Sequence, residues 1–279
     1  MEDFSDAALV LLGHGSTVNA ESARPVRQHA EELRRRKCFA EVREAFWKQA
    51  PQVKQVLAEL SAPRVFIAPL FISEGYFSDE TIPRELGFRG ERPEQLSRIQ
   101  RRGAQRLFYC KALGTNDRMT SVLLARARAI VEEFPFPRPP SPKDTTLFIV
   151  GHGTEQNRNS RATVERQAAL IRGSGLYAGV HAVFLEEEPR IGECYHIAQT
   201  RNIVVIPFFI SNGMHAREDI PVLLGEAERV VRQRLQSGRP TWRNPTERKG
   251  KLVWYAASVG SEPLIANVIL ELVREAARW

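Results

Sequence analysis

Two histidines and a glutamate in the second half of the chain have side chains suited to metal binding or proton transfer. His152, Glu186 and His215 each lie just beyond a short apolar run that is typical of a β-strand. Ligands bind beyond the carboxyl ends of the strands in open parallel sheets, so we expect the three side chains to converge there. Imidazole and carboxylate together suit a divalent first-row metal ion. The same groups could instead act as general bases, since neutral imidazole accepts protons near pH 7.

The two halves of the chain repeat one pattern. ALVLLGHGST (8–17) aligns with TLFIVGHGTE (146–155) at a shift of 138 residues, and APLFISEGYFSDETIPRELG (68–87) aligns with IPFFISNGMHAREDIPVLLG (206–225) at the same shift. The shift grows to 146 where YCKALG (109–114) matches YAASVG (255–260). An internal repeat of this kind predicts two copies of one structural unit, and the second copy carries an insertion before its last strand.

The first copy retains only one of the three candidate residues. His14 takes the place of His152, but Phe77 stands at the position of the second histidine and Lys48 at that of the glutamate. A residue needed for folding should occur in both copies, whereas chemistry can survive in one. We therefore predict that the second copy is active and the first is degenerate. His14 is then a vestige, a substrate contact or part of a metal delivery path.

The elements that must position these residues follow from the apolar pattern. Runs such as ALVLL, TLFIV and NIVVIPFFI are short, rich in Val, Ile and Phe and do not alternate, as in parallel strands buried on both faces. Segments with apolar residues at helical spacing separate them. The segment 134–145 has five prolines, which neither continue a helix nor join a sheet interior. We predict an α/β fold with two tandem domains, 1–133 and 146–279, joined by linker 134–145. Each domain is a small parallel sheet flanked by helices, with a cleft between the domains.

Composition narrows the protein class. The 279 residues carry a formal net charge of +7 and a pI near 9.6, which predicts an anionic partner. No run of about 18 apolar residues occurs, and the acidic start MEDFSDAALV does not resemble a secretion signal. The three cysteines are odd in number and far apart, so neither a disulfide framework nor a thiolate zinc site is indicated. We expect a cytoplasmic protein, without membrane association, that is a monomer or a weak homo-oligomer.

His29, in a charged helical segment, is expected to be solvated.

Three motifs resemble a known family. The GHGS and GHGT turns, the VFLE strand end and the loop PFFISNGMHAREDIP are similar to the class II chelatases, the sirohydrochlorin cobalt- and ferrochelatases of the CbiX and CbiK type. The resemblance covers nearly the whole chain. Its most specific part is the G-x-H-x-x-x-D-I-P string from Gly213 to Pro221. It implies two tandem chelatase-like domains that insert cobalt or iron, with nickel as a further option, into sirohydrochlorin in cobalamin or siroheme biosynthesis.

The resemblance also implies roles for individual residues. By position, His152 and His215 bind the metal and take protons from the macrocycle, and Glu186 completes the site. The strand end has the sequence LEEEP, so Glu187 or Glu188 could be the functional acid instead. The metal is a substrate rather than a resident cofactor. No nucleotide is expected, since no GxxxxGK[ST] motif occurs and no GxGxxG follows a strand, and no cysteine-rich tail suggests an iron–sulfur cluster.

The arginines offer a place for the acidic groups of such a substrate. Sirohydrochlorin is a polycarboxylate, and arginine binds carboxylates in bidentate pairs. The arginine-rich segments 89–106 and 232–251, which we expect to be loops, could supply these contacts. The alternative is that they form a solvated charged surface.

Three other functions compete with metal insertion. A metal or tetrapyrrole carrier could use the same site without turnover. A histidine-dependent phosphoryl-transfer enzyme would need an arginine before the histidine, where Gly13 and Gly151 stand. A nucleic-acid binder is disfavoured because the basic residues are spread over both halves without an aromatic–basic motif. We therefore expect an anionic tetrapyrrole as partner, and no nucleic acid.

Overall fold

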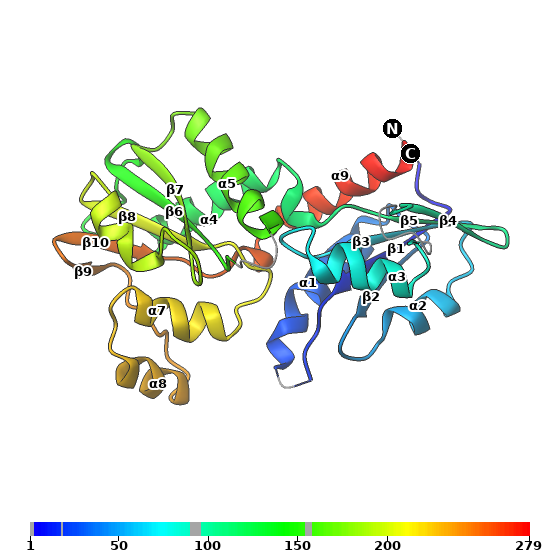
Figure 1. Cartoon of the computed structure of the whole chain (residues 1–279), viewed down its shortest axis with the longest axis horizontal. Helices are drawn as coiled ribbons and strands as arrows, with labels where there is room; N and C mark the ends of the chain where they lie inside the picture. Colours follow the sequence, from blue (N-terminus) through cyan, green and yellow to red (C-terminus); the bar gives the residue numbers. More distant parts are fainter. Residues whose placement is uncertain (1–2, 18, 90–95, 154–157) are drawn as a thin grey trace. The chain divides into compact units, whose positions relative to one another are not determined.

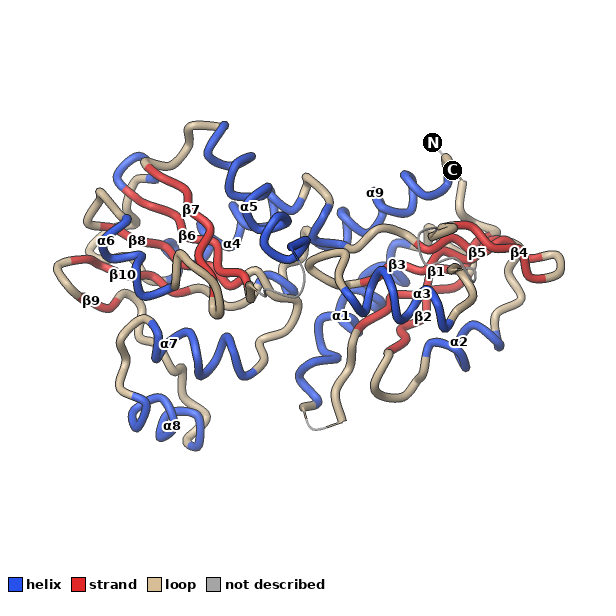
Figure 2. The backbone as a smooth tube through the Cα atoms, viewed as in Figure 1, coloured by secondary structure: helices blue, strands red, loops and turns tan. Residues whose placement is uncertain are grey.

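The chain forms two compact units. The computed structural model describes residues 3–17, 19–89, 96–153 and 158–279. Unit 1 consists of the described residues up to Met119 together with Pro263–Trp279, and unit 2 is Thr120–Glu262. Figure 1 shows the elements of each unit in sequence colours, and Figure 2 shows the same backbone by secondary structure.

Unit 1 is built on a five-stranded sheet with the strand order β2-β1-β3-β5-β4. Its first three strands and β5 are parallel, and β4 pairs antiparallel with β5 at the edge. The strands are β1 (Ala7–Gly13), β2 (Glu41–Phe46), β3 (Arg64–Pro69), β4 (Ile99–Arg102) and β5 (Gln105–Tyr109).

Unit 2 repeats this sheet with the order β7-β6-β8-β10-β9. Again the first three strands and β10 are parallel, and β9 is the antiparallel edge strand. The strands are β6 (Thr145–Gly151), β7 (Gly179–Phe184), β8 (Asn202–Pro207), β9 (Thr246–Arg248) and β10 (Lys251–Tyr255). The predicted α/β class is confirmed, with the correction that each sheet is mixed at one edge.

Helices lie on both faces of each sheet. Those of unit 1 are α1 (Arg24–Arg36), α2 (Val53–Glu59), α3 (Ile82–Glu85) and α9 (Ile265–Ala277). Those of unit 2 are α4 (Met119–Glu133, all but its first residue), α5 (Arg158–Gly173), α6 (Cys194–Ile197), α7 (Ile220–Leu223) and α8 (Glu228–Gln236). A π-helical turn precedes α3 at Tyr76–Thr81, and another precedes α7 at His215–Asp219.

The apolar runs form these strands because both of their faces are buried. Every residue of β1 and of β6 is buried. In unit 2, Phe148 and Val150 of β6 pack with α6 and α7, while α5 packs on β6 and β7. In unit 1, Val10 and Leu12 of β1 pack with α2 and α3, while α9 packs on β3 and β5. Burial on both sides explains why these runs do not alternate in polarity.

The compact units differ from the expected domains in their last helices. Helix α4 follows β5 along the chain but belongs to unit 2, and α9 follows β10 but belongs to unit 1. Residues 134–145 therefore lie inside unit 2 and do not separate the two units. A repeat alignment reports where a helix stands in the chain. It does not report which of two similar apolar sheet faces that helix covers.

The two arginine-rich segments are not simply loops. Where described, 89–106 includes β4 and the start of β5, and 232–251 includes the end of α8 and all of β9. Residues 90–95 lie outside the described part of the chain. The expected insertion in the second copy is present and forms α8, which has no counterpart among the described elements of unit 1.

Three further expectations concern helices, cysteines and His29. No helix of the described chain is long and apolar enough to cross a membrane. Cys38, Cys110 and Cys194 are free thiols. Burial raises the pKa of both Cys110 and Cys194 to about 12. The expectation for His29 was wrong, because its side chain is buried on the inner face of α1.

Candidate functional site

A tight glycine turn places His152 at the carboxyl end of β6. A Cβ atom at Gly151 would lie 2.6 Å from Val164 Cγ2, so only glycine allows this close approach. Gly153 has a φ of +69°, a left-handed conformation that favours glycine. The chain therefore turns directly after the strand and leaves the His152 side chain partly exposed.

Glu186 is brought to the same edge by an extension of the neighbouring ladder. Strand β7 pairs in register with β6, so that Phe184 lies opposite Gly151. Beyond the strand, the Glu186 amide donates a hydrogen bond of 3.1 Å to the His152 carbonyl. The Glu186 carboxylate then lies 3.7 Å from the His152 Nδ1 atom. Parallel pairing thus sets the carboxylate beside the imidazole.

His215 is the first residue of the π-helical turn that follows β8. The turn is closed by a hydrogen bond from the Ile220 amide to the His215 carbonyl. It is anchored from below by Tyr255, whose buried hydroxyl donates a hydrogen bond of 2.6 Å to the Ala216 carbonyl. Burial, together with the nearby Asp219 carboxylate, raises the pKa of Tyr255 well above its usual value, so the hydroxyl remains a donor. Single π-helical turns occur frequently at functional sites.

The two imidazole rings lie edge to face at this edge of the sheet. The ring centres of His152 and His215 are 5.0 Å apart, and the ring planes are nearly perpendicular at 86°. Two imidazoles that bind one tetrahedral metal ion at about 2.1 Å per nitrogen have centres separated by roughly 5 Å. The observed ring separation therefore fits a pair of ligands on one ion.

The hydrogen bonds of the two rings define their tautomers. His152 Nδ1 lies 2.8 Å from the Gly153 carbonyl oxygen, and His215 Nδ1 lies 2.6 Å from Asp219 Oδ2. Both oxygens can only accept, so each Nδ1 carries the proton that it donates. In a neutral ring the Nε2 lone pair is then left for a metal ion or a proton.

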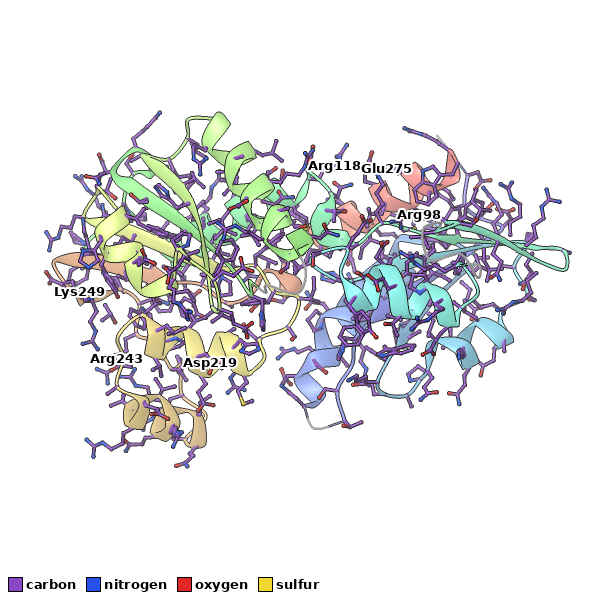
Figure 3. The ribbon with its side chains drawn as sticks, in the orientation of Figure 1. Arg98, Arg118, Asp219, Arg243, Lys249 and Glu275 are labelled. Atoms are coloured by element: carbon purple, nitrogen blue, oxygen red, sulfur yellow. The ribbon has the colours of Figure 1, made fainter. Side chains whose placement is uncertain are left out.

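Asp219 is a site residue to which the sequence analysis assigned no role. It stands four residues after His215, and this spacing places two side chains on one side of a helical turn. Figure 3 labels Asp219 on the ribbon of unit 2. Its place in the quoted G-x-H-x-x-x-D-I-P string was the available signal. The aligned position of the first copy is Thr81, which has no carboxylate.

The other two glutamates of the LEEEP strand end have different partners. Glu187 is mostly buried, with 15% of its side chain exposed, and pairs with Arg161 at 3.2 Å. Glu188 is exposed, and the pKa of its carboxyl group is lowered by hydrogen bonds with Glu193 and Arg190. Only Glu186 of the three is paired with an imidazole.

The site is not a closed metal cage. Across the described residues, no group of three or more His, Cys, Asp and Glu side chains is arranged to hold a metal ion. The structure thus brings His152, His215 and Glu186 together, and metal ligation by all three stays a prediction.

Unit 1 has the same local geometry with different side chains. His14 Nδ1 lies 2.9 Å from the Gly15 carbonyl oxygen. The ring of Phe77 occupies the place of the second imidazole, with its centre 5.3 Å from that of His14 and an interplanar angle of 79°. The Lys48 amide donates to the His14 carbonyl at 2.8 Å, and the Lys48 ammonium lies 5.6 Å from the centre of the Phe77 ring.

Comparison with known proteins gives one family. The CbiX family model matches the chain twice, over residues 8–130 and 146–276. A probable sirohydrochlorin cobaltochelatase from Halobacterium salinarum is 37% identical over 281 residues, which cover 96% of this chain and 91% of that protein.

Solved structures agree with the fold. DR2241 from Deinococcus radiodurans, a multi-domain protein with structural similarity to chelatases and two additional novel domains, has a TM-score of 0.78 and 29% identity. The match covers 99% of this chain and 56% of that chain, so this chain spans little more than half of DR2241. SirB from Bacillus subtilis with Fe³⁺ has a TM-score of 0.68 and 18% identity, covering 97% of this chain and 95% of that chain. A cobalt complex of the sirohydrochlorin chelatase SirB has a TM-score of 0.63 and 17% identity. The match covers 98% of this chain and 95% of that chain.

Proposed function

The chain belongs to the CbiX family, and we propose that it is a sirohydrochlorin chelatase, which inserts a divalent metal ion into the tetrapyrrole. The observation that carries this function is the facing pair of imidazoles at the carboxyl edge of unit 2. The name of the Halobacterium relative supports cobalt as the metal, and the SirB structures keep iron as an alternative.

The net reaction defines what the site must do. One divalent cation enters the ring, two pyrrole N–H protons leave, and no electron is transferred. The site must therefore present a cation and accept protons within a short distance of the ring nitrogens. Two Nε2 lone pairs on facing imidazoles can do both, because each can bind the ion or take one proton.

We assign distinct roles to the neighbouring carboxylates. Asp219 accepts a hydrogen bond from the Nδ1–H group of His215. This bond orients the ring and directs its Nε2 away from the carboxylate. Glu186 lies beside His152 and would balance positive charge when an ion or a proton arrives. Glu187 is held by Arg161 and Glu188 by Arg190, which supports Glu186 as the functional acid.

Turnover separates this function from that of a carrier. Purified protein at a few per cent of the substrate concentration is mixed with sirohydrochlorin and cobalt, ferrous iron or nickel, and the absorbance of the metallated product is followed. We expect acceleration over the protein-free rate with cobalt or iron and many product molecules per protein. A single stoichiometric change would indicate a carrier, and no acceleration with any metal would overturn the proposal.

A cytoplasmic location and a monomeric or weakly oligomeric state stay predictions.

A further inference from the structure

Unit 2 contains a cavity of about 640 Å³ whose lining includes Tyr255, the residue that anchors the turn of His215. It lies where β10 ends, at Ala256 and Ala257, between helix α4 and the segment 239–244. A second cavity of about 310 Å³ shares the wall formed by Arg239, Trp242 and Tyr255 and extends to the π-helical turn that starts at His215. Both cavities therefore lie at the carboxyl edge of the sheet, where ligands bind in this type of fold. The larger one has the volume of an ordinary ligand pocket.

The charged lining of the larger cavity is mostly cationic. Four arginines and one glutamate line it: Arg126, Arg234, Arg239, Arg243 and Glu133. Arg126 pairs with Glu262 at 3.2 Å, and Arg234 pairs with Glu226 at 3.1 Å. The side chains of Arg239 and Arg243 are exposed and make no hydrogen bond or ion pair with any described residue. Figure 3 labels Arg243 in unit 2.

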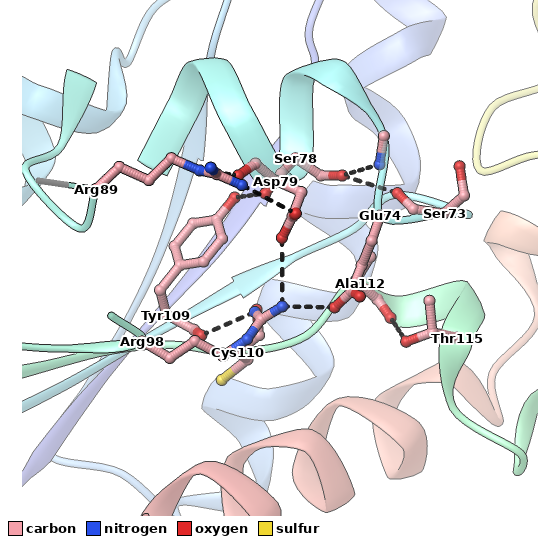
Figure 4. A network of polar contacts seen from close by, with 11 residues as sticks. Ser73, Glu74, Ser78, Asp79, Arg89, Arg98, Tyr109, Cys110, Ala112 and Thr115 are labelled. Carbon is pink, nitrogen blue, oxygen red and sulfur yellow. Dashed lines mark hydrogen bonds and ion pairs between the residues drawn. The ribbon is translucent and has the colours of Figure 1, made fainter. Parts of the chain in front are cut away.

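At the aligned positions of unit 1, an arginine is neutralised by groups of the protein itself. The shift of 146 residues aligns Asn244 with Arg98 and Glu133 with Trp279. Arg98 donates to the carbonyl oxygens of Tyr109 and Cys110 and pairs with Glu74 at 2.6 Å. Figure 4 shows this network, which also includes Asp79. The Arg98 guanidinium lies 5.9 Å from the centre of the Trp279 ring.

Each of these closing residues is replaced in unit 2. Among the described residues, the Asn244 side chain hydrogen-bonds only the backbone of Tyr255, donating from its amide nitrogen at 2.9 Å and accepting at its carbonyl oxygen at 2.7 Å. The two acids that neutralise Arg98 become Asn212 and Arg217. Unit 2 thus lacks the two acids and the arginine of this network, and its described residues line a cavity that contains four arginines.

We propose that this cavity, the arginine pocket, binds carboxylates on one edge of the tetrapyrrole, and that Arg239 and Arg243 determine specificity for a polycarboxylate ring. The proposal rests on the proposed function. Guanidinium groups without an internal partner bind carboxylates in charge-assisted pairs. The apolar wall of Phe134 and Trp242 accepts the neighbouring hydrocarbon part of the ring.

The main test removes both arginines. In Arg239→Ala/Arg243→Ala we expect the KM for sirohydrochlorin to rise by about tenfold or more, with kcat within about twofold, because the contacts bind substrate without touching the reacting nitrogens. The control Arg138→Ala/Arg229→Ala removes the same charge from exposed positions of unit 2 outside the pocket, and its KM should match the wild type. An unchanged KM in the pocket variant, beside an active wild type, would overturn the pocket and leave the proposed function intact.

A direct binding titration keeps the two proposals separate. Quenching of the fluorescence of metal-free sirohydrochlorin measures its Kd without any metal insertion. We expect weaker binding to the pocket variant even if insertion fails in every sample, and that outcome would contradict only the proposed function. Equal Kd values for wild type and pocket variant would contradict the pocket.

Two further binding measurements identify the chemical group that the arginine pocket recognises. The methyl ester of sirohydrochlorin should bind the wild type and the pocket variant equally, because the ester has no carboxylate charge. Inorganic phosphate at millimolar concentration should compete weakly. Strong competition by phosphate with no effect of esterification would overturn the assignment to substrate carboxylates.

A variant that carries the unit 1 residue at position 244 gives a second, independent test of the cavity. Asn244→Arg introduces the side chain that fills the equivalent place beside Tyr109. We expect a higher KM, because the longer side chain occupies the cavity, and a lower thermal midpoint of unfolding, because both hydrogen bonds of Asn244 to the Tyr255 backbone are lost. A normal KM in a folded Asn244→Arg protein would contradict the role of this cavity.

Discussion

The two units place a pair of rings in nearly the same way, but the second ring is an imidazole in unit 2 and a phenyl group in unit 1. In unit 2 the rings of His152 and His215 are 5.0 Å apart at 86°, and in unit 1 the rings of His14 and Phe77 are 5.3 Å apart at 79°. The backbone contacts that bring the second strand end to the first histidine also occur in both units. The fold therefore supplies a position, and the identity of the side chain decides whether that position can bind a cation.

The two units also differ in the residue beside the second ring. Lys48 stands where unit 2 has Glu186, and its ammonium group lies over the Phe77 ring. A cation over an aromatic face is a favourable contact, whereas a lysine beside an incoming metal ion would repel it. Unit 1 thus combines two replacements that suit each other and that remove an imidazole and a carboxylate, two groups able to bind a divalent cation.

The largest effect is expected when unit 2 is given the ring of unit 1. His215→Phe should lower the rate of metal insertion by at least about 100-fold, since it removes one of two proton acceptors while keeping the ring packing. The initial rate with sirohydrochlorin and cobalt measures this. The reciprocal change Phe77→His, which leaves Lys48 in place, should not raise the rate. A His215→Phe protein with more than a tenth of the wild-type rate would contradict the role of His215.

The next effect distinguishes the three adjacent glutamates. Glu186→Gln should lower kcat by about tenfold, because the charge beside His152 is lost without a change of shape. Glu187→Gln and Glu188→Gln serve as controls and should stay within about twofold in kcat. Glu187→Gln also lowers the thermal midpoint, since its partner Arg161 is left without this acid. A larger kcat loss in either control would move the functional acid to that residue.

A smaller effect is expected at Asp219, which acts through His215. Asp219→Asn keeps the size but presents a weaker acceptor to the Nδ1 proton, so kcat should fall by severalfold to about tenfold. A purely structural role would change stability without a change in pH dependence. We expect instead a shifted pH profile of kcat and recovery of activity in Asp219→Glu. An unshifted profile together with wild-type kcat would exclude the positioning role.

The smallest effect concerns the tyrosines beneath the two π-helical turns. Tyr255 and Tyr109 each donate a hydrogen bond to the turn above, at 2.6 and 2.7 Å. Tyr255→Phe and Tyr109→Phe should each lower the free energy of unfolding by about 1 kcal/mol, measured by denaturant titration. Only Tyr255→Phe should also reduce the insertion rate, by about two- to threefold, since its turn carries His215. Equal rates in the two variants would show that the turn needs no such anchor.

The sequence predicted most of the fold and the central pair of the site. Internal alignment paired His152 and His215 with His14 and Phe77. The two histidines of unit 2 meet because β6 and β8 are parallel neighbours, so that the segments after them start at one edge of the sheet. It also located the insertion that forms α8. The role of Asp219 was not predicted, because its contact with His215 depends on the helical turn at His215–Asp219, which brings residues four apart together.

Other features depend on tertiary structure alone. The edge strands β4 and β9 lie in arginine-rich stretches whose polar residues are typical of loops, yet pairing with one neighbour is enough to order them. The placement of α4 in unit 2 and of α9 in unit 1 follows from which apolar face each helix covers. The lining of the arginine pocket comes from α4, α8 and the segment 239–244, which only the folded chain brings together.

The most direct test of the central claim compares the two histidines that both units retain. Initial rates of cobalt insertion into sirohydrochlorin are measured for the wild type, His152→Ala and His14→Ala, with thermal midpoints to show that all three are folded. If unit 2 alone carries the chemistry, His152→Ala loses at least about 100-fold in rate and His14→Ala stays within about threefold of the wild type. The reverse pattern, or equal losses in both variants, would contradict the assignment of the active site to unit 2.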